Sequence, residues 1–253
     1  MFSQRATSLP LERFVQLEKG KRGKISAMQW IAGYDLFLFD FDGLLADTEA
    51  LHFQAYRETC AEYGLDLNWS MPEYGKAAYF HATGLFDALH KAFPQTIDAQ
   101  MWPEFYAKKK AAFMRLAPKA ELMPGVRELL RALNGADKRM CVVTHSSAEM
   151  IAPIRASHAI LDLIPHWVTR ADYSNPKPAP DGYLLAIEQY GRPGDRIIGF
   201  EDTLKGASSL IAAQKITPVL INSFIDFEPQ ESVIFAKSFP KLATILDAAQ
   251  KKA

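Results

Sequence analysis

Short runs of consecutive apolar residues, rich in β-branched and aromatic side chains, recur along the chain from residue 36 onward. They are Leu36–Phe39, Met140–Val143, Ile197–Phe200 and Pro218–Ile221, with a shorter candidate at Trp167–Thr169. Continuous apolar runs of this length are typical of strands that are buried on both faces, as in a parallel sheet. We therefore predict a parallel sheet built from these strands.

Polar and apolar positions with helical spacing separate the predicted strands. The predicted helices are Val126–Leu133, Ala148–Ser157, Asp181–Tyr190 and Leu204–Gln214. Strands that alternate with helices indicate βαβ units, in which helices cover both faces of the sheet. The predicted fold class is α/β with a Rossmann-like parallel sheet core, and such sheets bind ligands beyond the carboxyl ends of their strands.

About ninety residues between Glu49 and Met140 contain no convincing strand, which is far more than one crossover helix requires. The candidate helices in this stretch are Leu51–Tyr63, Leu85–Ala92 and Pro103–Leu116. The predicted domains are an N-terminal extension at 1–32, a core at 33–50 and 118–253, and an inserted helical cap at 51–117. Because the insertion begins just after a cluster of acidic residues, the cap could cover that cluster as a lid.

The first 32 residues carry more basic than acidic side chains and lack the apolar core of a secretion signal. Their early Arg, Ser and Thr residues leave a transit peptide as one alternative. We favour an extension that packs on the domain or stays partly loose, because acidic residues interrupt the segment and its amphipathicity is weak.

The composition is that of an ordinary globular protein, with 253 residues, 49% hydrophobic and 23% charged, and zero formal net charge. Zero net charge gives no electrostatic reason to expect nucleic acid or a membrane surface as a partner. The apolar runs are far shorter than the roughly 20 residues that span a bilayer. Cys60 and Cys141 form no disulfide framework, which favours a cytoplasmic location. Without a heptad pattern the oligomeric state stays open, and a monomer is favoured.

Side chains with acid, hydroxyl or amine groups follow the predicted central strands. These residues are Asp40 and Asp42 after the first strand, Thr144, His145 and Ser146 after the second, Glu201 and Asp202 after the third, and Lys177 between two prolines upstream of a helix. The carboxyl ends of parallel strands meet at one edge of a sheet. We therefore expect these groups to converge in one crevice.

Carboxylates brought together in this way repel one another unless a cation lies among them. Mg²⁺ takes oxygen ligands, typically one or two carboxylates together with water and phosphate. Asp40 and Asp202 supply such ligands, with Glu201 in or near the coordination shell. The predicted cofactor is therefore Mg²⁺, and Lys177 offsets part of the remaining negative charge.

The same residue types suit phosphoryl transfer. A carboxylate beside a bound phosphoryl group can attack the phosphorus, and Asp40, directly after the strand, fits that role. Asp42 could exchange a proton with the leaving or entering oxygen. Thr144 can donate a hydrogen bond to a phosphoryl oxygen, and Lys177 can neutralise charge in the transition state. Each feature alone also fits an ordinary turn, helix cap or surface charge, but their combination at strand ends favours a phosphate site.

Together these residues resemble the haloacid dehalogenase superfamily, and most closely its helical-cap branch of beta-phosphoglucomutase-like proteins and phosphatases. The matching motifs are DFDGLLADTE, VVTHSS, NPKPAPDGY and GFEDTLKGASSLIAA, and the resemblance covers the chain from about Tyr34 onward. It implies Asp40 as the nucleophile and Asp42 as the general acid and base. It also implies Mg²⁺ bound by Asp40, the backbone carbonyl of Asp42 and Asp202, with Glu201 assisting.

The resemblance also separates possible reactions. Dehalogenases of the superfamily lack the second aspartate of the first motif, so Asp42 indicates phosphoryl chemistry. A phosphomutase needs a second cationic clamp for the phosphate that is not reacting. In relatives that clamp includes an arginine in the cap and a Lys-Asn pair after the second motif, where this chain has Ala78 and Ser147-Ala148.

We therefore expect a Mg²⁺-dependent phosphatase that acts on a small phosphorylated metabolite. A sugar phosphomutase and a catalytically quiet binding protein are the alternatives.

Further candidates for substrate contact come from the cap and from the second motif. His52 matches a histidine that is frequent in this branch, and Lys109 fits a cap lysine that reaches the active site in relatives. Because lysines also stand on either side of Lys109, the sequence does not decide which of the three corresponds to the cap lysine. The alternative is that all three lie on a solvated helix face. His145 replaces the small residue usual after Thr144 and would narrow the pocket, and Ser146 adjoins it.

Overall fold

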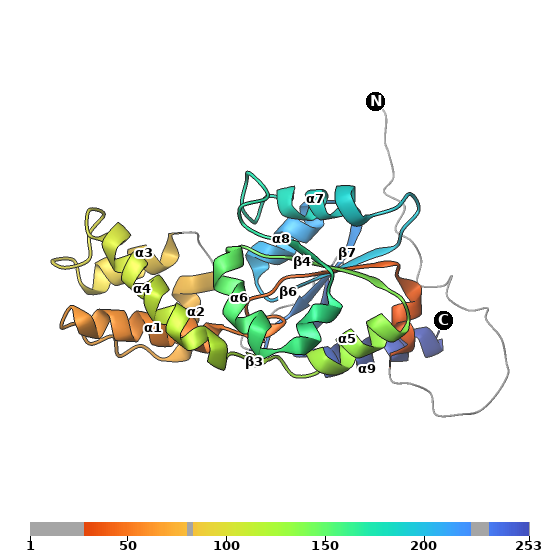
Figure 1. The fold of residues 1–253 in the computed structure, drawn as a ribbon, viewed down its shortest axis with the longest axis horizontal. Coiled ribbons are helices and arrows are strands. Elements are labelled where there is room, and N and C mark those ends of the chain that lie inside the picture. The colour runs from red at the N-terminus through yellow and green to blue at the C-terminus, as the bar shows by residue number, and fades with distance from the viewer. Residues whose placement is uncertain (1–27, 80–82, 224–232, 253) are drawn as a thin grey trace.

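The computed structural model describes residues 28–79, 83–223 and 233–252 (Figure 1). Nearly all of the extension predicted at residues 1–32 therefore lies outside the described residues. Within the described part of the chain, no helix combines the length and the apolar character needed to cross a membrane.

A six-stranded sheet with the order β5-β4-β1-β6-β7-β8 forms the centre of the molecule. Its strands are β1 (Leu36–Phe39), β4 (Arg139–Val143), β5 (His166–Val168), β6 (Ile197–Glu201), β7 (Ile216–Ile221) and β8 (Ile234–Ala236). All neighbouring strands pair in parallel, which confirms the predicted fold class. The edge strand β8 was not predicted, although Ile234 and Phe235 lie in the short apolar run Val233–Ala236.

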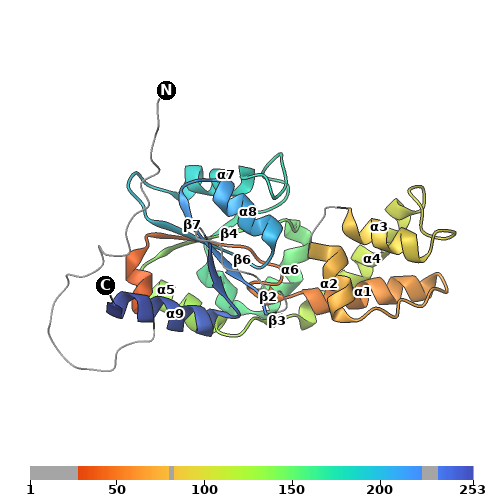
Figure 2. The same ribbon diagram turned by 180° about the vertical axis from the view of Figure 1, so that it is seen from behind.

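Helices cover both faces of this sheet (Figures 1 and 2). The helices are α5 (Val126–Gly135), α6 (Ala148–Ser157) and α9 (Phe239–Lys252) on one face, and α7 (Asp181–Tyr190) and α8 (Leu204–Ala212) on the other. Successive side chains of β1 point to opposite faces, so Phe37 and Phe39 pack toward the first group while Leu36 and Leu38 pack toward the second. Burial on both sides explains why this strand is apolar throughout.

Four helices lie together beyond one end of the sheet (Figures 1 and 2). They are α1 (Glu49–Glu62), α2 (Met71–Tyr79), α3 (Gly84–Ala92) and α4 (Trp102–Leu116). They share a hydrophobic core of their own, which includes Phe53, Tyr74 and Phe105. Helix α2 was not predicted, because Pro72 and Gly75 are both unfavourable helix residues. The division into core and cap at residues 51–117 stays a prediction, and we call α1 to α4 the cap helices.

A short antiparallel pair lies where the chain passes to and from the cap helices. Strand β2 (Ala46–Asp47) precedes α1, and β3 (Glu121–Leu122) follows α4 and the 3-10 helix η3 (Ala117–Lys119). Ala46 pairs with Leu122, and Asp47 pairs with Glu121. The two connections between the cap helices and the sheet therefore run side by side.

The 3-10 helix η2 (Gln29–Gly33) places an aromatic side chain in the core just before β1. Trp30 is 2% exposed, and its ring centre lies 6.0 Å from that of Phe37 and 6.2 Å from that of Phe200. The last described residues of the segment predicted as an extension thus contribute to the core of the sheet.

Replacing Trp30 with alanine should lower the free energy of unfolding by about 3–5 kcal/mol, because the change leaves a cavity among aromatic side chains. Urea denaturation of the Trp30→Ala variant measures this loss. The exposed neighbour Gln29 provides the control, and Gln29→Ala should change stability by less than about 0.5 kcal/mol. Equal stability of the two variants would contradict the packing described for Trp30.

Candidate active site

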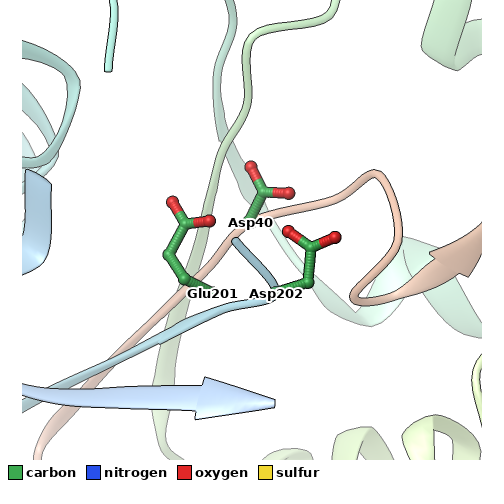
Figure 3. A group of neighbouring side chains, drawn as sticks. All are labelled: Asp40, Glu201 and Asp202. Carbon is green, nitrogen blue, oxygen red and sulfur yellow. The ribbon is translucent and has the colours of Figure 1, made fainter. Parts of the chain in front are cut away.

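The predicted site residues lie at the carboxyl ends of three adjacent strands. Asp40 directly follows β1, Thr144 directly follows β4, and Glu201 ends β6 with Asp202 next to it. Strand β1 lies between β4 and β6 in the sheet, so the three groups meet at one edge. Figure 3 shows the carboxylates of Asp40, Glu201 and Asp202 on the same side of the strand ends.

These three carboxylates form a compact group. One oxygen from each of Asp40, Glu201 and Asp202 lies within 4.8 Å of the others, and the residues are 7%, 1% and 5% exposed. Burial raises the pKa of Asp40 to about 8 and the pKa of Asp202 well above its ordinary value, and repulsion from Glu201 adds to both effects. Three hard oxygen donors held together in one buried group fit a divalent ion such as Mg²⁺.

Two glycines allow the backbone to lie directly against this acidic group. A Cβ atom added to Gly43, whose φ is +75°, would lie 2.2 Å from Oδ2 of Asp202. A Cβ atom added to Gly206 would lie 1.9 Å from Oε2 of Glu201. Both positions therefore require glycine for the acids to keep their places.

Lys177 lies within the acidic group and is itself 6% exposed. Its Nζ lies 2.5 Å from Oδ1 of Asp40 and 2.6 Å from Oε1 of Glu201, and it donates a hydrogen bond to the carbonyl of Val143 at 2.8 Å. Burial alone would lower the pKa of Lys177, but the two carboxylates outweigh that effect and raise it. Lys177 is therefore a charged partner of both Asp40 and Glu201 at neutral pH.

Glu201 has a further partner that could not be expected from the sequence pattern. The hydroxyl of Tyr183 donates a hydrogen bond to Oε1 of Glu201 at 2.5 Å. Tyr183 is fully buried on α7 and belongs to the core on that face of the sheet. The apolar residues around Tyr183 in the sequence indicate a packing role. Its hydrogen-bond partner is 18 residues further along the chain, so the contact could not be predicted from local spacing.

Asp42 is held separately from the other acids. Its Oδ2 accepts hydrogen bonds from the hydroxyl of Ser146 at 2.6 Å and from that of Thr144 at 3.3 Å. Thr144 Oγ1 also accepts a hydrogen bond from the backbone N–H of Ser146 at 3.0 Å. The structure thus gives Ser146, predicted as a substrate contact, a direct contact with Asp42. The expected contact between the Asp42 carbonyl and a metal stays a prediction.

Two predicted cap residues contact each other above the acids. Nζ of Lys109 lies 2.7 Å from Nδ1 of His52, and the His52 ring stacks on Phe113 with 4.0 Å between ring centres. Burial lowers the pKa of Lys109 to about 8, and burial with the adjacent Lys109 lowers the pKa of His52 well below 6.5. A neutral His52 can therefore accept a hydrogen bond from the Lys109 ammonium.

The neighbouring lysines of α4 point elsewhere. Lys108 lies 3.9 Å from Glu62 and 3.8 Å from Glu104, and Lys110 lies 2.6 Å from Glu149, all in exposed ion pairs. Lys109, by contrast, is 4% exposed. Of the three consecutive lysines, Lys109 is the one that lines the same cavity as Asp40, Glu201 and Asp202.

A cavity of about 270 Å³ lies between the strand ends and the cap helices. The sheet side supplies Asp40, Asp42, Lys177, Glu201 and Asp202, the cap side supplies His52, Tyr56, Tyr74, Tyr106 and Lys109, and His145, Ser146 and Lys205 also line it. The predicted residues other than Thr144 thus face one small cavity, whereas the tyrosines and Lys205 were not predicted. These cap tyrosines could not be singled out from the sequence, because it does not show which face of a helix borders a cavity.

A comparison with protein families agrees with this geometry. The family model described as haloacid dehalogenase-like hydrolase matches residues 37–217. The chain belongs to this family. The match spans more than half of the hydrolase and includes the strand-end residues that surround the cavity.

Individual relatives support the same assignment. The probable pseudouridine-5'-phosphatase of Drosophila melanogaster is 31% identical over 183 residues, which cover 70% of this hydrolase and 77% of that protein. Protein CbbY of Rhodobacter capsulatus is 31% identical over 185 residues, with 70% and 80% covered. The crystal structure of CbbY from Rhodobacter sphaeroides in complex with phosphate has the same fold, with a TM-score of 0.68, 24% identity, and 83% of this chain and 96% of that chain covered. The predicted family and the predicted class of hydrolase are confirmed.

Binding of Mg²⁺ should stabilise the hydrolase, because a cation relieves the repulsion among the three buried carboxylates. At a concentration 100 times the dissociation constant, we expect a rise in melting temperature of about 5–10 °C. Differential scanning calorimetry with and without MgCl₂ measures the rise. Asp202→Asn should abolish it, whereas Glu128→Gln, an exposed acid on α5, should keep it. An equal rise in Asp202→Asn would exclude this residue as a ligand.

Proposed function

We propose that this hydrolase is a Mg²⁺-dependent phosphatase that acts on a small phosphomonoester. The observation that carries the proposal is the meeting of Asp40, Asp42 and Lys177 with Glu201 and Asp202 in one cavity of about 270 Å³. The names of the pseudouridine-5'-phosphatase relative and the phosphate-bound CbbY structure support phosphate-ester chemistry in this family. The cavity volume favours a substrate of modest size.

The proposed reaction has two steps on the same aspartate. In the first, a carboxylate oxygen of Asp40 attacks the phosphorus, the ester P–O bond breaks, and Asp42 gives its proton to the departing alcohol. In the second, Asp42 takes a proton from water, which attacks the phosphorus of the aspartyl phosphate and releases phosphate. Asp40 is then free for the next substrate molecule.

Other residues hold these two aspartates in place and balance charge. Lys177 fixes one oxygen of Asp40, and the hydroxyls of Ser146 and Thr144 fix the carboxylate of Asp42. Mg²⁺ bound by Asp40, Glu201 and Asp202 would withdraw negative charge from the phosphoryl oxygens. The cap helices border the cavity and place His52, Tyr106 and Lys109 opposite the two aspartates.

One feature of the cavity supports water, rather than a sugar hydroxyl, as the final acceptor. Ala78 of α2 lines the cavity at the position where the resemblance places a clamp arginine in phosphomutases. A methyl group cannot replace that arginine as a partner for the unreactive phosphate of a sugar bisphosphate. A coupled assay for hexose 1-phosphate isomerisation in the presence of the bisphosphate should therefore give no product.

Asp40→Asn should lower the rate of p-nitrophenyl phosphate hydrolysis by about 10³-fold or more, because the amide is a far weaker nucleophile. A continuous absorbance assay with MgCl₂ measures the rate. Asp66→Asn, at an exposed position outside the cavity, is the matched control and should keep full activity. Full activity of Asp40→Asn would refute the nucleophile, and inactivity of the unmodified protein on a panel of phosphate esters would refute the proposed function.

Asp42→Asn should lower kcat by about 10²–10⁴-fold, the range usual for loss of a general acid and base. The loss of kcat should be greater for alkyl phosphate esters, whose alcohol is a poor leaving group, than for p-nitrophenyl phosphate, whose phenolate leaves without a proton. Comparing both ester types in the variant and the unmodified hydrolase tests this difference. An equal loss for the two esters would contradict proton donation by Asp42.

A further inference from the structure

Three lysines line the catalytic cavity, and two of them already have partners there. Lys177 pairs with Asp40 and Glu201, and Lys109 contacts His52. For the ammonium of Lys205, the described part of the chain provides neither an ion pair nor a hydrogen bond. Lys205 is therefore a cation at the substrate cavity whose charge is not yet balanced.

Lys205 also stands at a position in its helix that is unfavourable for a cation. Leu204 begins α8, so Lys205 stands in the first turn, and that turn contains no acidic residue. The first turn of a helix carries partial positive charge and disfavours a lysine. The cap of the helix is already satisfied, since Thr203 Oγ1 accepts a hydrogen bond from the N–H of Gly206 at 3.1 Å. Helix stability therefore gives no reason for a cation here.

His145 provides a second polar group at the same cavity. Its Nε2 is buried and has no hydrogen-bond partner among the described residues. Burial, together with the positive charges of Lys177, Lys205 and Arg170, lowers the pKa of His145 to about 4. The ring is therefore neutral at pH 7 and adds no second positive charge to the cavity beside Lys205.

Acidic residues elsewhere in the cavity would repel a second negative charge on the substrate. Asp40, Asp42, Glu49, Glu201 and Asp202 all line it. A bound divalent cation and Lys177 offset this charge at the reacting phosphoryl group. A further anionic group on the substrate would need a cation of its own. The ammonium of Lys205 supplies that cation.

We propose that Lys205 binds a second anionic group of the substrate in the cavity that His145 also lines, so that the hydrolase selects small phosphomonoesters that carry a carboxylate or a second phosphate. The inference rests on the proposed phosphatase function and names the class of its substrate. It assigns the recognition to residues other than the clamp positions Ala78 and Ser147-Ala148. Lys205 is a specificity-determining residue in this arrangement and takes no part in bond breaking.

Three esters on one carbon chain test this selection. They are 3-hydroxypropyl phosphate, 3-(phosphonooxy)propanoate and propane-1,3-diyl bisphosphate, which differ only in a hydroxyl, carboxylate or phosphate at the far end. Each is measured as a competitive inhibitor of p-nitrophenyl phosphate hydrolysis with MgCl₂ present. At least one of the two doubly anionic esters should bind about tenfold more tightly than the hydroxyl ester, in line with a charged hydrogen bond. The stronger of the two identifies the anionic group.

Variants at Lys205 then show whether this residue causes the preference. Lys205→Gln should reduce the ratio of inhibition constants to near one, and Lys205→Arg should retain most of it. Lys241→Gln, at an exposed position on α9, is the matched control and should keep the full ratio. Urea denaturation of the variants verifies that each one is folded.

The outcomes separate this inference from the proposed function. Hydrolysis of p-nitrophenyl phosphate without any preference among the three esters overturns the inference alone, as does an unchanged preference in Lys205→Gln. If hydrolysis is absent, the proposed function fails, and calorimetric binding of the three esters to the hydrolase still tests the preference. Tighter binding of a doubly anionic ester that depends on Lys205 supports the inference in either assay.

Discussion

Repulsion among buried carboxylates is the constraint on which the candidate site depends. Asp40, Glu201 and Asp202 are held together at the ends of β1 and β6, where little water is available to screen them. The fold offsets part of this cost with the buried ammonium of Lys177 and with the Tyr183 hydroxyl. The remaining negative charge suits a divalent cation, so the arrangement that costs the fold stability is also the one that the proposed reaction uses.

The parallel sheet makes this concentration of charge possible. Glu201 and Asp202 follow Asp40 by 161 and 162 residues along the chain. Even so, Phe39 and Phe200, which directly precede Asp40 and Glu201, pair with each other in adjacent strands. Every parallel strand delivers its next residue to the same edge, so short polar segments after apolar strands become neighbours. The cap helices then close the space above that edge, with a core of their own and with further residues of α1 and α4 that join the core of the sheet.

Much of this arrangement could be predicted from the sequence, because it depends on strand direction and on residue type. The apolar run Leu36–Phe39 specifies a buried parallel strand, and the acids after it must lie at the ligand-binding edge. Contacts between distant elements were not predictable in the same way. The bond from Ser146 to Asp42 and the orientation of Lys109 depend on side-chain directions that periodicity does not encode. Helix α2 was missed because its packing against other cap helices overrides weak helix propensity.

The β2–β3 pair has a mechanical consequence for the whole molecule. The backbone crosses from the sheet to the cap helices twice, and the two crossings are joined by antiparallel pairing at Ala46 and Leu122. The cap helices also pack against the core of the sheet through Ala55, Phe113 and Leu116, so a swing of the cap would pivot close to this packing and to the paired strip. His52 and Lys109 come from α1 and α4 and are packed on each other, so they would travel as a unit during such a swing. One motion of the cap would then both admit a reactant to the cavity and bring His52 and Lys109 to it.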